Sequence, residues 1–192
     1  MNTALDVARY LLHLSNQEPE PELVTHLRLQ KLLYYCQGWA LTFRDEPLFP
    51  DRIEAWPHGP VVTTVYPIFA DYASAPLAPH EGRDCDAIDR NTKSFLQSIW
   101  DEYKKHSASE LRRKTHEETP WKAARGQRGP DDPASVEITH ASLTAFFSAE
   151  YERTALPGLD LASLRRIRRE FEEGRGIPFE QIKSELTAAL TR

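Results

Sequence analysis

The residues best suited to chemistry lie between positions 111 and 121, where His116 is followed directly by Glu117 and Glu118. An imidazole with a carboxylate partner is a common general base in hydrolases. Adjacent residues on a helix do not face each other, however, and no serine or cysteine nucleophile stands out nearby. The sequence therefore favours a structural role, in which Thr115 and His116 bond backbone groups at a helix end and Trp121 anchors the core. An enzyme that uses His116 is the alternative.

A second unusual segment, AWPHGP at 55–60, combines a tryptophan, two prolines and a glycine. The prolines restrict the backbone and Gly59 frees it, so the segment predicts a rigid turn. His58 could act there as a base or a metal ligand, but a histidine exposed in a surface turn is the simpler interpretation.

Metal and cofactor sites find little support in the sequence. The seven histidines are scattered without HExxH or HxH spacing, and no glycine-rich phosphate loop is present. Cys36 and Cys85 are too few and too far apart to predict a disulfide scaffold, which favours a reducing cytoplasm. We therefore predict no catalytic residue, no metal and no cofactor.

Length and charge limit the remaining possibilities. A chain of 192 residues with 40% apolar and 28% charged residues is typical of one globular domain with a short appendage. No stretch approaches the ~18 apolar residues of a membrane span, and no secretory signal is expected. The net charge of −5 argues against extensive nucleic-acid binding. A run of four arginines at 165–169 is interpreted as a solvated face, with contact to nucleic acid as the weaker alternative.

The elements that would position these residues are predicted to be mostly helices. Caps at Thr3, Thr25, Ser107 and Thr139 precede apolar residues at helical spacing, and further helices are expected near 91–103 and from Thr119. Residues 52–56 alternate and predict a short strand. Pro60 is expected to open a helix whose apolar face contains Val62, Val65, Tyr66 and Phe69. The predicted fold is mainly α with a minor β-strand or hairpin element, a helical domain over 1–156, and a two-helix appendage over 157–192.

Several short motifs occur in an order that resembles the Panacea domain family, also known as the phage-associated GepA-like family. They are LQKLLYY at 29–35, GWA at 38–40, PLF at 47–49, IEAW at 53–56, GPV at 59–61 and Tyr66, followed by Leu111, Thr115, His116, Pro120 and Trp121. The resemblance covers about residues 3–150. By carry-over, the family-signature positions are Lys31, Trp56, Gly59, Pro60, Tyr66, Thr115, His116, Pro120 and Trp121.

What the resemblance implies is a helical antitoxin that neutralises a cognate protein toxin by direct binding. A member of the family acts instead as an adaptor that delivers its toxin to a protease, so such an adaptor is the alternative function. The resemblance attaches no enzymatic activity to the signature residues.

The region after Pro157 carries a separate resemblance. REFEEGRGIPFEQI at 169–182 looks like the C-terminal toxin-binding segment of small antitoxins. Two short amphipathic helices with little core of their own need an apolar groove, either on their own domain or on a partner. The predicted toxin-binding residues are therefore Ile167, Phe171, Arg175, Ile177, Phe179, Ile182 and Leu186.

Overall fold

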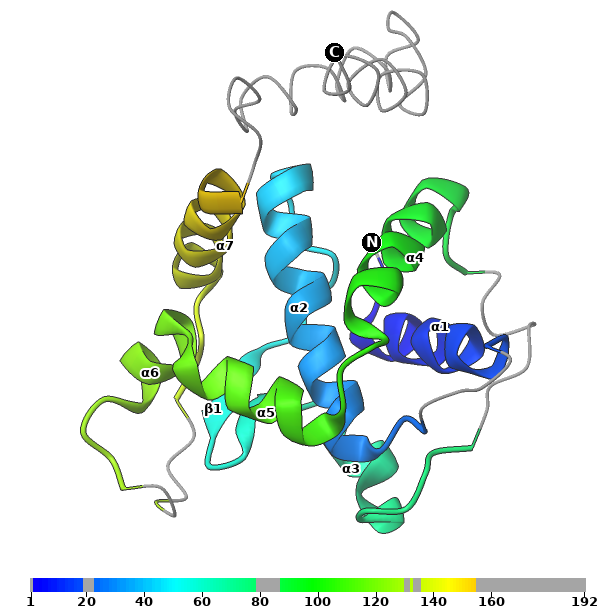
Figure 1. Ribbon diagram of the computed structural model, residues 1–192, viewed down its shortest axis with the longest axis horizontal. Helices are drawn as coiled ribbons and strands as arrows, with labels where there is room; N and C mark the ends of the chain where they lie inside the picture. The colour runs from blue at the N-terminus through cyan, green and yellow to red at the C-terminus, as the bar shows by residue number, and fades with distance from the viewer. Residues whose placement is uncertain (1, 19–22, 79–86, 130–131, 133–135, 155–192) are drawn as a thin grey trace, which may run out of the picture.

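Helix α2 (His26–Arg44) is the central element of the computed structural model, which describes residues 2–18, 23–78, 87–129, 132 and 136–154. The helices α1, α4, α5 and α7 and the strand β2 all pack against it (Figure 1). The predicted mainly α fold with a small β element is confirmed. The predicted domain boundary at 156 and the appendage over 157–192 lie outside the described residues.

The side chains of α2 are buried on nearly every face, although the sequence predicted a single apolar stripe. Polar Gln30, Lys31 and Gln37 are buried together with the leucines. A helix at the centre of a bundle has neighbours all round, so it must satisfy its polar groups internally. Trp39 and Phe43 of α2 are only half-buried.

The surrounding helices begin where the capping residues predicted. Helix α1 (Ala4–Asn16) starts after Thr3 and α5 (Ala108–Glu117) after Ser107, and both caps form reciprocal capping boxes. Asp89 caps α4 (Arg90–Tyr103), and Pro120 lies in the first turn of α6 (Thr119–Arg125). Helix α7 is His140–Thr154, and the Thr139 hydroxyl accepts from the Ser142 amide at its start.

A two-stranded antiparallel hairpin, β1 (Ile53–Trp56) and β2 (Gly59–Val62), lies at the lower end of α2 (Figure 1). Strand β1 was predicted, but the helix expected to open at Pro60 is wrong. Pro60 pairs with Ala55 in the second strand, whose edge position tolerates a residue without an N–H donor. The Val62 amide instead donates to Gln30 Oε1 of α2 at 2.8 Å. Only four residues form the following helix, α3 (Tyr66–Phe69), before the 3-10 turn η1 (Ala70–Tyr72).

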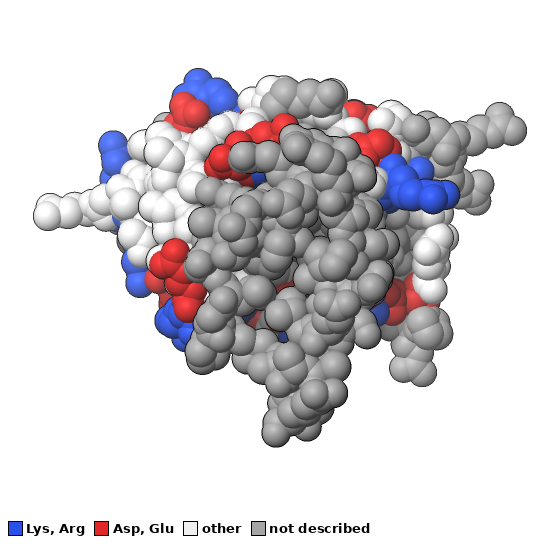
Figure 2. Space-filling model, turned by 90° about the horizontal axis from the view of Figure 1, so that it is seen from above, with Lys and Arg blue, Asp and Glu red and all other residues white. Residues whose placement is uncertain are grey.

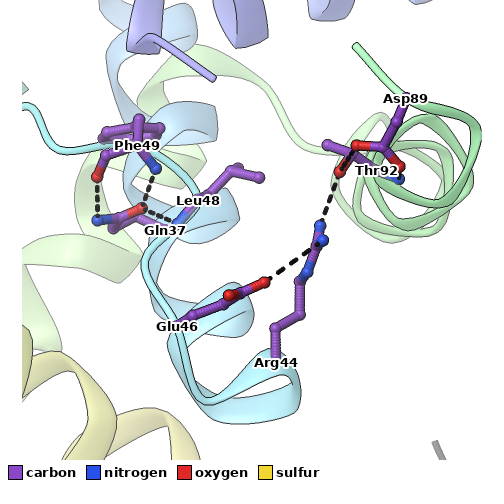
Figure 3. Close-up of polar contacts among 7 residues, drawn as sticks. All are labelled: Gln37, Arg44, Glu46, Leu48, Phe49, Asp89 and Thr92. Atoms are coloured by element: carbon purple, nitrogen blue, oxygen red, sulfur yellow. Dashed lines mark hydrogen bonds and ion pairs between the residues drawn. The ribbon is translucent and has the colours of Figure 1, made fainter. Parts of the chain in front are cut away.

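The chain that returns from α2 to the hairpin is held by a buried glutamine. Gln37 Oε1 accepts from the amides of Leu48 at 3.0 Å and Phe49 at 3.3 Å, and its Nε2 donates to the Phe49 carbonyl at 3.0 Å (Figure 3). Arg44 donates to Thr92 at 2.9 Å and so ties the end of α2 to α4. These contacts set the position from which β1 begins.

The surface at the end away from the hairpin carries both signs of charge. Seen from that end, the acidic and basic side chains of the described residues are interspersed (Figure 2). None of the helices in the described ranges is long and apolar enough to cross a membrane.

Candidate functional site

The family-signature positions converge on the hairpin, although they come from six different elements. Lys31 belongs to α2, Gly59 and Pro60 begin β2, and Thr115 belongs to α5. A Cβ built on Gly59 would lie 2.6 Å from Lys31 Cε and 3.0 Å from Thr115 Oγ1. Lys31 and Thr115, which are 84 positions apart in the sequence, thus both lie against Gly59.

Lys31 is the buried centre of this contact. Its side chain is fully buried and its Nζ donates to the Pro60 carbonyl at 2.9 Å. Within the described residues no carboxylate lies at ion-pair distance from it. Burial, together with the nearby Arg112 charge, lowers the pKa of Lys31 to about 7. Lys31 therefore fixes the hairpin on α2 through a hydrogen bond and not through an ion pair.

The remaining signature side chains form a row of rings across the outer side of the hairpin, which we call the aromatic row: Tyr66, Trp56, Trp121 and His116. His116 stacks on Trp121 with centroids 4.0 Å apart and an interplanar angle of 10°. Trp121 Nε1 donates to the Trp56 carbonyl at 3.0 Å, and the Trp56 and Tyr66 rings lie 4.7 Å apart. All four side chains are only half-buried, so they present ring surface to solvent. Pro120 is buried and begins the helix that carries Trp121.

The predicted roles of Thr115, His116 and Trp121 are only partly confirmed. Thr115 Oγ1 donates to the Arg112 carbonyl at 2.9 Å, as expected of a residue near a helix end. His116 stacks on an indole instead of bonding the backbone, and its Nε2 is buried without a hydrogen-bond partner. Trp121 was expected to anchor the core but is half-buried at its edge. A ring that stacks flat on another ring at the surface buries apolar area without entering the core.

The two carboxylates that follow His116 in the sequence bind other side chains. Glu117 pairs with Arg113 at 3.1 Å, and Glu118 Oε1 accepts from Tyr35 Oη at 2.8 Å. Burial lowers the pKa of His116 to about 4, and the neighbouring charge of Arg112 contributes in the same direction. The imidazole is therefore neutral at pH 7, and within the described residues it has no carboxylate partner of the kind that the enzyme alternative requires. Across the described ranges, no group of three or more acidic, histidine or cysteine side chains could hold a metal ion.

Glu118 forms a largely buried polar cluster with three tyrosines, Tyr34, Tyr35 and Tyr103. Burial raises the pKa of Glu118 to about 7, whereas its hydrogen bond to Tyr35 opposes the shift. Tyr35 stacks on Tyr103 at 4.1 Å. Glu118 Oε2 and Tyr34 Oη are buried without a hydrogen-bond partner of good geometry, although the Tyr34 hydroxyl is near enough to lower the Glu118 pKa. Sequence reasoning missed this cluster because nothing local connects Tyr35 with a carboxylate 83 residues away.

Basic side chains surround the His116 end of the row. Arg112 and His58 are exposed, and the exposure of His58 in the hairpin turn was predicted. Arg125 is buried, and its guanidinium carbon lies 5.9 Å from the centre of the Trp121 ring. Its guanidinium nitrogens donate to the carbonyls of Gly129 and Asp132. The structure thus brings together aromatic faces and cations but not a nucleophile with a base.

The structure does not test the predicted toxin-binding residues of the appendage. They lie beyond residue 154, outside the described residues: Ile167, Phe171, Arg175, Ile177, Phe179, Ile182 and Leu186.

Comparison with known proteins bears on the same part of the chain. Residues 29–122 match the family model described as antitoxin SocA-like, Panacea domain. The match runs from the second turn of α2 to α6 and contains all nine signature positions. Neither curated proteins nor solved structures give a match. The resemblance to the Panacea domain family that the ordered motifs indicated is therefore confirmed over residues 29–122.

Proposed function

We propose that this protein is an antitoxin that neutralises a cognate protein toxin by direct binding, and that it acts in the cytoplasm. The observation that carries the proposal is the family match over 29–122, which spans the whole signature site. The geometry supports a binding role, because the site offers half-exposed rings and exposed cations, both common in protein interfaces. It pairs His116 with no carboxylate.

We further propose that residues 157–192 contribute to toxin binding. The support comes from the sequence, in which two amphipathic segments carry the apolar residues Ile167, Phe171, Ile177, Phe179 and Ile182. Such segments gain little by folding alone and gain more by covering an apolar groove. Loss of toxin affinity on removal of 157–192 would locate part of the interface there.

Co-expression with the neighbouring gene tests the main proposal. The neighbour's product alone should stop growth, and growth should return when the full chain is expressed with it at equal or higher level. A pull-down should recover both proteins in stoichiometric amounts. Growth arrest that persists, together with no recovered complex, would contradict the proposal.

Two further measurements separate the alternatives. A proteolytic adaptor would shorten the toxin's half-life, whereas an antitoxin that binds stoichiometrically leaves toxin levels unchanged while it blocks toxicity. An enzyme that uses His116 would lose function in His116→Ala even where toxin binding and thermal stability are kept. An antitoxin that acts by binding should not separate these properties.

A further inference from the structure

Exposed apolar side chains follow Tyr66 along the chain, in the α3–η1 segment. Ile68 is 48% exposed and Tyr72 is 39% exposed, directly after Tyr66 at the end of the row. Leu23 is 58% exposed, and it precedes a backbone pair that joins Val24 to Leu77 at 2.9 Å. In the described ranges these three are the large apolar side chains that are exposed. Helix α3, which carries Ile68, lies at the same end of the molecule as the hairpin (Figure 1).

The other end of the row carries an exposed cation, Arg112. Arg112 pairs with no carboxylate among the described residues. The adjacent Arg113 and the nearby Lys105, in contrast, pair with Glu117 and Glu102 at 3.1 and 3.2 Å. Four basic side chains act on the pKa of His116: Arg112 and His58, which are exposed, and Lys31 and Arg125, which are buried. The exposed Arg112 guanidinium attracts an acidic group, and the attraction is strong where a partner excludes water.

We propose that the toxin docks on this surface, from Ile68 and Tyr72 along the aromatic row to Arg112. The toxin segment that binds carries an acidic side chain, which pairs with Arg112, and a large apolar side chain, which covers Ile68 and Tyr72. This inference rests on the proposed function and adds the contact surface and the chemistry of the partner. Tryptophan, tyrosine and arginine are the residues that contribute most binding energy at protein interfaces, and all three occur here.

A protein segment fits this surface better than nucleic acid does. The cations gather at one end of the row, whereas Glu54 accepts from Trp56 Nε1 and Asp71 is exposed near the other end. A phosphate backbone carries one charge type along its length and needs a continuous basic strip. An acidic and apolar peptide matches the polarity of the two ends.

Affinity for the neighbouring gene's product, measured with the full chain, tests the inference. Arg112→Glu and Ile68→Glu should each raise Kd by about tenfold or more, because each places a like charge or a buried carboxylate against the partner. Arg90→Glu is the matched control, since Arg90 is an exposed arginine on α4 and should leave Kd within about twofold. The thermal midpoint of each variant should equal that of the parent, because both tested side chains are exposed.

The outcomes distinguish this inference from the proposed function. A parent chain that binds its toxin while both Arg112→Glu and Ile68→Glu bind equally well overturns the surface and leaves the antitoxin role intact. If only Ile68→Glu weakens toxin binding, the inferred acidic side chain of the toxin segment is wrong. If only Arg112→Glu weakens it, the inferred apolar side chain is wrong. Salt-dependent binding of a DNA duplex that disappears in Arg112→Glu, without an effect on the toxin, also contradicts it. A parent chain that neither binds nor neutralises the toxin removes the proposed function itself.

Discussion

Gly59 is the position at which single-residue stereochemistry decides how the hairpin meets α2. Its φ of +99° lies in a region that residues with a side chain rarely adopt, and a Cβ there would be 2.6 Å from Lys31 Cε. Gly59→Ala should therefore lower the free energy of unfolding by roughly 1–3 kcal/mol, measured by urea denaturation. Gly129→Ala is the control, because nothing lies within 4 Å of its Cβ position, and it should cost less than about 0.5 kcal/mol. Equal losses in the two variants would contradict this role.

Individual residues also show the limit of reasoning from chemistry alone. The position of His116 beside two glutamates predicted either a general base or a side chain that hydrogen-bonds backbone groups at a helix end. In the structure His116 stacks on Trp121 instead. The spacing of the two residues does not identify that contact, because the change of chain direction at Glu118, between α5 and α6, sets the distance between the two rings. Glu118 provides a similar case, since its partner Tyr35 belongs to α2.

At the scale of elements, Gln37 connects α2 to the strand that follows it. Gln37→Met keeps a similar volume but leaves the amides of Leu48 and Phe49 and the Phe49 carbonyl without their partner. Buried backbone groups without partners are costly, so we expect a loss of roughly 2–4 kcal/mol in the free energy of unfolding. Gln17→Met, at an exposed glutamine after α1, should change it by less than about 0.5 kcal/mol. A small effect at Gln37 would show that the connection holds without this side chain.

Helices were easier to predict than strand β2. Thr3, Thr25 and Ser107 signal helix starts through local hydrogen bonds, which depend on residues only three positions away. Pro60 satisfies the local rule for a helix start equally well. Its strand conformation depends on pairing with Ala55 and on contact with Lys31. A four-residue strand next to a proline carries too little periodicity to identify alone.

For the whole molecule, the buried Glu118 carboxyl should make stability depend on pH. Burial raises its pKa from 4.5 to about 7, so the folded chain keeps a proton that the unfolded chain has released. The contribution of Glu118 to stability is therefore present below about pH 4.5 and is lost as the pH rises to about 7. Glu118→Gln should match the parent near pH 4 and exceed its free energy of unfolding by about 1–3 kcal/mol at pH 8.

The comparison between variants isolates this effect from other groups. His116, whose pKa is lowered to about 4, changes stability in the opposite sense between about pH 4 and 6.5, and it is present in the parent and in the variant alike. Glu117→Gln is the matched control, because Glu117 is exposed and its pair with Arg113 contributes little. Parallel pH profiles for the parent and Glu118→Gln would contradict the prediction.

The sequence by itself determined the helical class, the positions of most helix starts, strand β1 and the family, because each depends on residues close together in the chain or on ordered motifs. Only the tertiary structure decided that Lys31 is buried under the hairpin, that Glu118 binds Tyr35, and that four signature rings form one row. The reason is physical: burial and hydrogen bonding between distant residues depend on how the helices pack. Local propensity does not specify that packing.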